Sequence, residues 1–99
     1  MFVQDNIHTI DKFSFHVHKN SLYVIELKGP LTSYAAFIFV QKILELKRNK
    51  MVFDFCAVTV IEMPAVRVLI ELAKIIDIII WNIPTSLEHY FDGKITILP

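Results

Sequence analysis

The sequence predicts an α/β domain, in which an N-terminal β-hairpin leads into a mostly parallel sheet of four to five strands with three helices. Residues 13–18 alternate strictly between apolar and polar side chains, and residues 51–58 form an almost continuous apolar run. Further along the chain, apolar segments of strand length alternate with segments of helical periodicity. Strands that alternate with helices after an initial hairpin are typical of a domain built on a largely parallel sheet.

The first half of the chain contains the predicted hairpin and the first helix. Residues 13–18 predict a half-buried strand, because every second side chain is apolar. A second strand over residues 22–28 follows a short polar turn and ends at Gly29-Pro30. Thr32 or Ser33 can then cap a helix that we expect to run to about residue 47.

The second half begins with the apolar strand over residues 51–58, which only Asp54 interrupts. Such a run predicts burial on both faces of the sheet, with helices on each side. We expect Asp54 to be a hydrogen-bonded structural residue and Cys56 to be a small buried core residue. The remaining predicted elements are a helix from about residue 64 to 76, a strand over residues 78–83, a short helix over residues 86–91 and a strand over residues 94–98.

Size and charge restrict the classes of function that the chain can have. It has 99 residues, of which 55% are hydrophobic, so its length fits one domain with a real core. Lys and Arg together number 10, as do Asp and Glu, and no strongly basic cluster is present. Nucleic-acid binding requires a concentrated basic face. We therefore expect one folded domain that does not bind nucleic acid.

The location of the protein is predicted from its cysteine content and its apolar segments. Cys56 is the sole cysteine, which suits a reducing compartment, and the first residues do not resemble a signal peptide. Residues 65–83 are apolar enough to suggest a membrane span, but they contain four charged side chains. Each would cost roughly 2.5–3.5 kcal/mol at the centre of a bilayer. We therefore expect a cytoplasmic protein without direct membrane insertion, in which this segment forms a helix and then a strand.

Three stretches of the sequence resemble the STAS domain, the fold of the anti-sigma factor antagonists. LYVIELKGPLTSYAA is similar to the strand-Gly-x-Leu-helix opening of that family. MVFDFCAVTVIEMPAVRVLIELAK resembles its central strand, switch loop and following helix, and IIIWNIPTSLEHYFDGKITIL resembles its closing strand, helix and strand. The resemblance covers residues 13–98, so we expect a single STAS-like domain over residues 1–99. It implies a non-enzymatic role in binding another protein.

The chain departs from this family at the most diagnostic motif. The family reads Asp-Ser-Ser-Gly after the central strand, and the second serine is the phosphoacceptor in the regulated members. In this chain Glu62 stands at the aspartate, Met63 at the first serine, Pro64 at the phosphoacceptor and Ala65 at the glycine. The resemblance thus implies a partner-binding site with a degenerate phosphorylation motif, which could not be switched by phosphorylation at Pro64. Whether phosphorylation of Thr32, Ser33 or Thr59 replaces that switch stays open.

The residues themselves allow both a structural and a functional interpretation of this seam. Proline is favoured in the first turn of a helix, and a carboxylate just before a helix is stabilised by the helix dipole. The following helix has only a narrow polar stripe, and its flanks must be covered either by the domain or by a partner. The predicted partner-binding residues are Glu62, Met63, Pro64, Val66, Arg67 and Ile70, together with Phe37 and Ile38 of the preceding helix.

Several partners are compatible with such a module. The leading hypothesis is an anti-sigma or kinase-like regulator, with a homodimer through the same surface as an option. The alternative is a small STAS-like subunit docked on the ATPase of a bacterial lipid-transport ABC complex. No glycine-rich phosphate loop is present, and we expect no cofactor.

An enzyme or metal-binding protein is the third class of function. It would use Asp54 with Glu62, or the pair His16 and His18, which share one face of a predicted strand. A solvated strand face is the better explanation of the two histidines, so we predict no metal site from the sequence. The remaining imidazoles, which nothing in the sequence places nearby, belong to His8 and His89.

Overall fold

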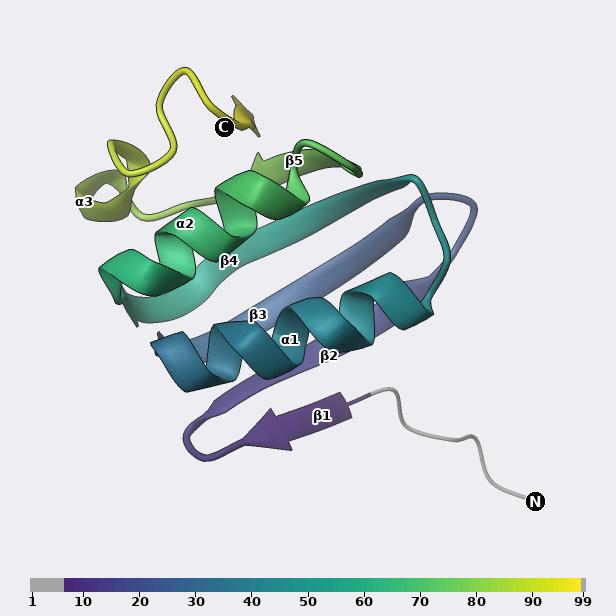
Figure 1. The fold of residues 1–99 in the computed structure, drawn as a ribbon, viewed down its shortest axis with the longest axis horizontal. Helices are drawn as coiled ribbons and strands as arrows, with labels where there is room; N and C mark the ends of the chain where they lie inside the picture. Colours follow the sequence, from purple (N-terminus) through teal and green to yellow (C-terminus); the bar gives the residue numbers. More distant parts are fainter. Residues whose placement is uncertain (1–6, 99) are drawn as a thin grey trace.

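Six strands follow one another across a single sheet in the order in which they occur along the chain. The structure is a computed structural model, and it describes residues 7–98 (Figure 1). The strands in this range are β1 (Ile7–Ile10), β2 (Phe13–Lys19), β3 (Tyr23–Leu31), β4 (Lys50–Ile61), β5 (Asp77–Trp81) and β6 (Thr96–Leu98). The helices are α1 (Ser33–Glu45), α2 (Met63–Leu72) and α3 (Thr85–Glu88).

The pairing of the strands confirms the predicted fold class. β1, β2 and β3 pair antiparallel, whereas β3, β4, β5 and β6 pair parallel. The strand β1 was not predicted, and it raises the strand count from the expected four or five to six. Its side chains are almost all exposed, and its sequence IHTI does not show the alternation of apolar and polar residues that would identify a half-buried strand.

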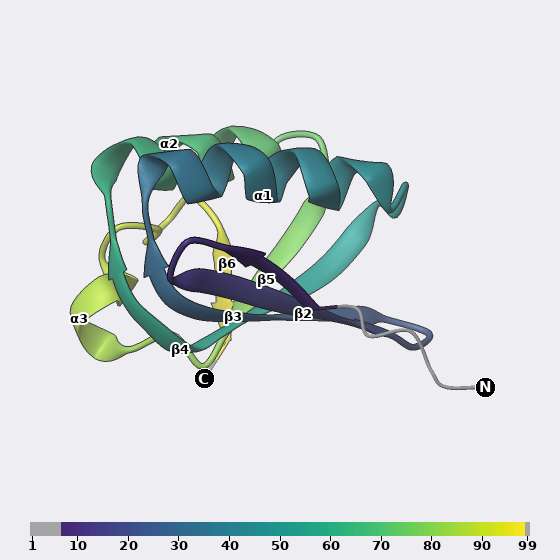
Figure 2. The same ribbon diagram turned by 90° about the horizontal axis from the view of Figure 1, so that it is seen from below.

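The helices α1 and α2 lie side by side on the same face of the sheet (Figure 2). The prediction of helices on both faces is therefore wrong. The crossovers β3–α1–β4 and β4–α2–β5 proceed in the same direction across the sheet. Because parallel crossovers are right-handed, two crossovers in one direction place their helices on one face. On the opposite face of β4, which we call the open face, Asp54 is half-buried and Cys56 is exposed, so Cys56 is not the core residue that we expected.

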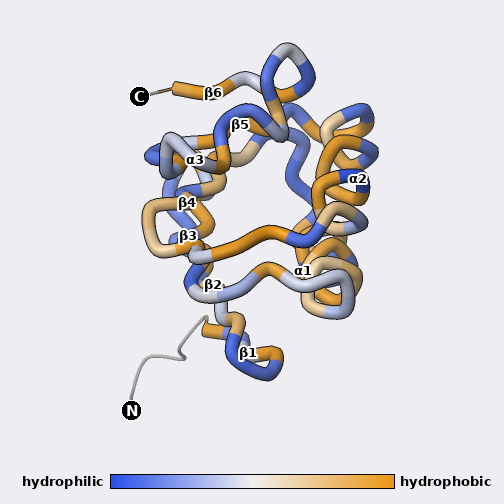
Figure 3. The backbone as a smooth tube through the Cα atoms, turned by 90° about the vertical axis from the view of Figure 1, so that its left-hand side faces the viewer, coloured by the Kyte–Doolittle hydropathy of each residue, from blue (hydrophilic) through white to orange (hydrophobic). Residues whose placement is uncertain are grey.

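Figure 3 shows the sheet on one side and the helices α1 and α2 on the other, and the buried side chains of both layers form one core. The three apolar side chains of the alternating strand β2 are buried there, as predicted. Phe39 of α1 lies at the centre, with its ring edge-on to Phe13, Phe15 and Phe53 at centroid distances of 5.9, 4.8 and 5.3 Å. Such aromatic pairs contribute about 0.5–1.5 kcal/mol each beyond the burial of their surface. This cluster ties the antiparallel half of the sheet to α1 and β4.

Several element boundaries differ from the prediction. α1 ends at Glu45 because Lys47 has a left-handed backbone with φ of 55°, which a helix cannot continue. β3 continues through Gly29-Pro30 to Leu31, because Gly29 adopts a φ of 93° at an irregularity in the pairing with β4. α2 ends at Leu72, and α3 and β6 are shorter than predicted. None of the helices in residues 7–98 is long and apolar enough to cross a membrane.

Candidate functional site

The helices α1 and α2 begin next to each other at one edge of the sheet. Leu31 at the end of β3 is in register with Ile61 at the end of β4, so the two parallel strands finish together. The Glu62 backbone N–H donates a hydrogen bond to the Leu31 carbonyl oxygen at 3.1 Å. We call residues 31–33 and 61–64 the helix-start seam, and this seam contains Glu62, Met63 and Pro64, three of the residues that the resemblance aligns with the STAS family motif.

The carboxylate of Glu62 bonds across the seam to the start of α1. Its Oε1 atom accepts one hydrogen bond from the Ser33 backbone N–H at 2.6 Å and a second from the Ser33 hydroxyl at 2.8 Å. These two hydrogen bonds hold the pKa of Glu62 below its ordinary value of 4.5, although slight desolvation opposes them. The negative charge thus lies at the positive end of the α1 dipole and joins the two helix starts.

The same end of α1 has its own cap, and α2 begins without one. The Thr32 hydroxyl oxygen accepts a hydrogen bond from the Ala35 backbone N–H at 3.1 Å, as an N-cap residue does. Glu62 occupies the N-cap position of α2 but makes no side-chain cap to that helix. Pro64 lies in the first turn of α2, where its missing N–H leaves no hydrogen bond unmade. The predicted helix start at this seam is confirmed. The Glu62 carboxylate, however, accepts hydrogen bonds from the start of α1 and not from α2.

The structure separates the predicted partner-binding residues into exposed and buried ones. At the seam and along α2, Glu62, Met63, Pro64 and Arg67 are exposed and Ile70 is half-buried. Val66 is only 2% exposed and belongs to the core, so its inclusion in a docking surface was wrong. The domain itself covers this flank of α2, because α1 packs beside it. On α1, Phe37 is 57% exposed and Ile38 is half-buried.

Two further exposed residues of α1 escaped the sequence analysis. Tyr34 is 62% exposed and Leu44 is 44% exposed. Together with Phe37 they occur at spacings of three and seven residues, which places them on one face of the helix. We call these three residues the α1 stripe. The spacing was visible in the sequence, but only the position of α1 on the sheet shows which of its faces is free.

The residues of the third hypothesis lie in two places: Asp54, His16 and His18 are on the open face, whereas Glu62 is at the helix-start seam. Asp54 accepts hydrogen bonds from the Cys56 backbone N–H at 3.0 Å and from the Asn82 side-chain amide at 3.4 Å, as expected of a structural residue. Glu62 comes eight residues after Asp54 along β4, which is about 26 Å at 3.3 Å per residue. These two carboxylates therefore cannot share a cation. His16 and His18 lie on the open face.

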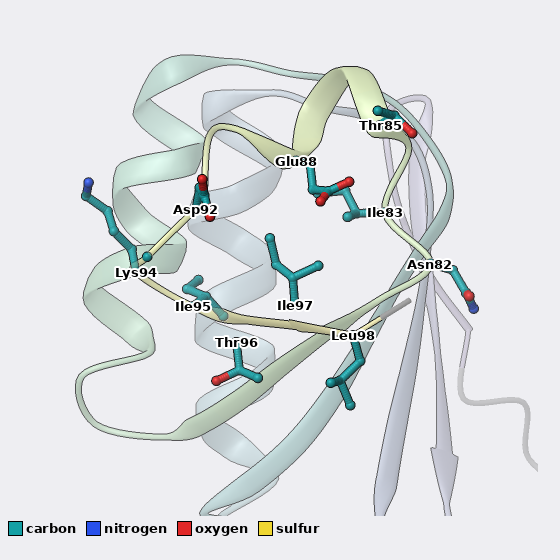
Figure 4. Close-up of a pocket in the computed structure, with 11 residues that line it drawn as sticks. Asn82, Ile83, Thr85, Glu88, Asp92, Lys94, Ile95, Thr96, Ile97 and Leu98 are labelled. Carbon is teal, nitrogen blue, oxygen red and sulfur yellow. The ribbon is translucent and has the colours of Figure 1, made fainter.

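A hollow of about 1010 Å³ lies beside the edge strand β6, between that strand and α3. Figure 4 shows the Ile83, Glu88 and Ile97 side chains directed toward its interior, whereas Asn82 and Lys94 point away from it. Among the described residues, the wall combines aliphatic side chains with the carboxylates of Glu88 and Asp92. This arrangement does not form the converging set of polar groups that identifies an active site.

Comparison with solved structures identifies the fold. The structure of the anti-sigma factor antagonist SpoIIAA in its unphosphorylated form matches with a TM-score of 0.71 at 14% sequence identity, over 86% of this chain and 87% of that chain. An uncharacterized protein of the DUF3478 family from Shewanella loihica, described as having a SpoIIAA-like fold, matches with a TM-score of 0.54 at 10% identity, over 92% of this chain and 88% of that chain. No protein-family model matches the sequence, and no curated protein matches it either.

These likenesses establish an α/β domain with a SpoIIAA-like, and hence STAS-like, fold. The resemblance predicted from the sequence is confirmed at the level of the fold. Because the sequence identities are 14% and 10%, the similarity shows how the chain folds and does not identify a binding partner.

Proposed function

We propose that this domain is a non-enzymatic protein–protein interaction module that docks through the helix-start seam and the α1 stripe. The observation that carries the proposal is the exposure of Met63, Tyr34 and Phe37, at 49%, 62% and 57%, around a rigid edge of the fold. Single exposed apolar residues are ordinary, but aromatic anchors on a fixed helix are typical of binding hot spots. The SpoIIAA likeness supports the proposal, since that protein is named an anti-sigma factor antagonist.

The hydrogen bonds of the seam prepare it for docking. Ser33 is held by Glu62, and Tyr34 follows it directly in the first turn of α1. Met63 follows Glu62 in the same way in α2. Tyr34 and Met63 therefore flank two charge-assisted hydrogen bonds, and these bonds fix the backbone on which each side chain stands. A surface that is ordered before binding loses less conformational entropy when a partner arrives.

The proposed partner is an anti-sigma or kinase-like regulator, bound without a phosphorylation switch at Pro64. No hydroxyl is present at residue 63 or 64, and the Ser33 hydroxyl already donates to Glu62. A phosphate on Ser33 would place two negative groups side by side, which would open the seam. We therefore propose docking that is not switched at residue 64 and that is constitutive unless a group such as the Ser33 hydroxyl is phosphorylated.

The test compares matched surface substitutions. Phe37→Asp and Met63→Asp place a charge in the proposed surface, whereas Ile75→Asp places the same charge at a residue that is 69% exposed beyond the far end of α2. Partners captured from the native host by the wild-type chain are identified, purified and titrated against each variant. We expect affinity to fall at least roughly tenfold for the first two variants and to be unchanged for the third.

The outcomes separate the alternatives. If the wild type and the folded Phe37→Asp variant bind the partner equally well, this surface is ruled out. It is also ruled out if Ile75→Asp loses as much affinity as Phe37→Asp. Capture of a membrane-transport ATPase in place of a regulator would favour the role of a lipid-transport subunit. Sedimentation at several concentrations detects a homodimer, and the same three variants show whether it uses this surface.

A further inference from the structure

Three potential metal ligands converge on the open face, opposite to α1 and α2. The alternation of β2 directs His16 and His18 to this face, while Val17 between them points into the core. Their imidazole rings lie 4.2 Å apart between centroids. Glu26 of β3 is directly opposite His16 in the antiparallel register, so its carboxylate projects from the same face.

The donor atoms of these residues already lie close together. His18 Nε2 is 2.6 Å from Glu26 Oε1, and His16 Nδ1 is 3.7 Å from that same oxygen. All three donor atoms lie within 4.8 Å of one another. Two ligands of one tetrahedral Zn²⁺ ion, each about 2.1 Å from the metal, are about 3.4 Å apart. Small side-chain rotations would therefore bring the three atoms to ligand spacing.

We propose that His16, His18 and Glu26 form a binding site for a divalent transition-metal ion of the Zn²⁺ class. Two imidazole nitrogens and one carboxylate oxygen suit Zn²⁺, Ni²⁺ or Cu²⁺, whereas Mg²⁺ and Ca²⁺ require oxygen ligands. Two paired strands carry the ligands, so the backbone positions are fixed. The histidine and glutamate side chains are 38% and 53% exposed, which gives an ion access and leaves coordination positions for water.

A simple ion pair accounts for only part of this arrangement. It explains the short contact between His18 and Glu26. It leaves His16 at 3.7 Å from the carboxylate, beyond hydrogen-bonding distance, although its ring lies against that of His18. A shared cation uses all three side chains. In the next strand Asp54 is in register with Glu26, and its negative charge adds to the attraction of a cation to this face.

The experiment is a titration of the full, tag-free and metal-stripped chain with ZnCl₂. We expect one Zn²⁺ per chain by calorimetry, and no binding of Mg²⁺ at the same concentration. NMR of the imidazole rings provides an independent measurement on the unaltered protein. The chain has four histidines, and those that respond to Zn²⁺ should be His16 and His18, while His8 and His89 stay unchanged. His8 stacks on Phe15, whose side chain is buried beneath α1, and so serves as an internal control.

Matched variants identify the ligands. His16→Gln, His18→Gln and Glu26→Gln should each weaken Zn²⁺ binding at least roughly tenfold, whereas His89→Gln should leave it unchanged. The absence of Zn²⁺ binding at millimolar concentration would overturn the proposal, and so would equal binding by His16→Gln and His89→Gln. If a variant is unfolded, the NMR titration of the unaltered chain decides the question. The partner-binding proposal concerns the helix-start seam and α1, so either proposal can fail without the other.

Discussion

Replacement of Gly29 by alanine should destabilise the domain more than the same replacement at Gly93. Both glycines have positive φ, at 93° and 74°. A Cβ atom at Gly29 would lie 2.3 Å from the Lys12 carbonyl oxygen, in the turn between β1 and β2, whereas a Cβ at Gly93 would meet nothing within 4 Å. The two substitutions therefore share the backbone strain and differ in the steric clash.

The magnitudes follow from this difference. Positive φ costs an alanine about 1–2 kcal/mol relative to glycine, and this applies to both sites. Overpacking against a fixed backbone atom adds about 1–3 kcal/mol at Gly29 alone. Gly93→Ala should thus lose about 1–2 kcal/mol of unfolding free energy, and Gly29→Ala about 2–5 kcal/mol.

Urea denaturation followed by far-ultraviolet circular dichroism measures both losses. With a slope of about 1.5 kcal/mol per molar urea, the extra loss at Gly29 corresponds to a midpoint lower by roughly 0.7–2 M than that of Gly93→Ala. Equal midpoints for the two variants would refute the argument, because the clash with Lys12 would then have no energetic effect. A lower midpoint for Gly93→Ala would refute it as well.

Three further predictions concern the core, the seam and the thiol. Phe53→Ala should lower the free energy of unfolding by about 3–5 kcal/mol, since the ring is fully buried in the aromatic cluster. A loss below about 1 kcal/mol would contradict that packing. The pKa of Glu62 is lower in the folded state than its ordinary value of 4.5. The contribution of this carboxylate to the free energy of unfolding should therefore be complete above pH 4.5, and it should disappear as the pH falls through the folded-state pKa. Glu62→Gln should therefore be less stable than wild type at pH 7 and equal to it in strong acid, and a constant difference would argue against the Ser33 bonds. Cys56 is exposed, yet desolvation and the neighbouring Asp54 raise the pKa of its thiol above 9.0. Iodoacetamide should therefore alkylate Cys56 slowly at pH 8, and it should react faster in the Asp54→Asn variant. Equal rates in the two proteins would exclude the influence of that carboxylate.

The fold class could be predicted because it depends on periodicities within short segments. The alternation in residues 13–18 and the apolar strand that begins at Met51 are properties of consecutive residues, and both appear as strands in the structure. The helix starts at Thr32 and at the Glu62-Met63-Pro64 seam are local in the same sense, because capping depends on neighbouring residues. Even the sequential order of strands and helices was sufficient to suggest the STAS-like fold, which the comparison with SpoIIAA confirms.

The errors occur where distant segments meet. Burial on both faces was inferred for the central strand, but the handedness and direction of two crossovers placed both helices on one face and left Cys56 exposed. The same arrangement buried Val66 beside α1. A helical wheel identifies the flank on which such a residue lies, but it does not show whether another element covers that flank.

Local features of the sequence predict the α/β class and the starts of α1 and α2, and they show that residue 64, which the resemblance aligns with the phosphoacceptor serine of the STAS family, is a proline. Local features do not predict that Glu62 bonds to Ser33, 29 residues away, or that the carboxylate of Glu26 on β3 approaches both histidines of β2. Helix capping and strand alternation depend on residues that are close in the sequence. Strand register and crossover handedness, which bring these side chains together, are properties of the whole sheet.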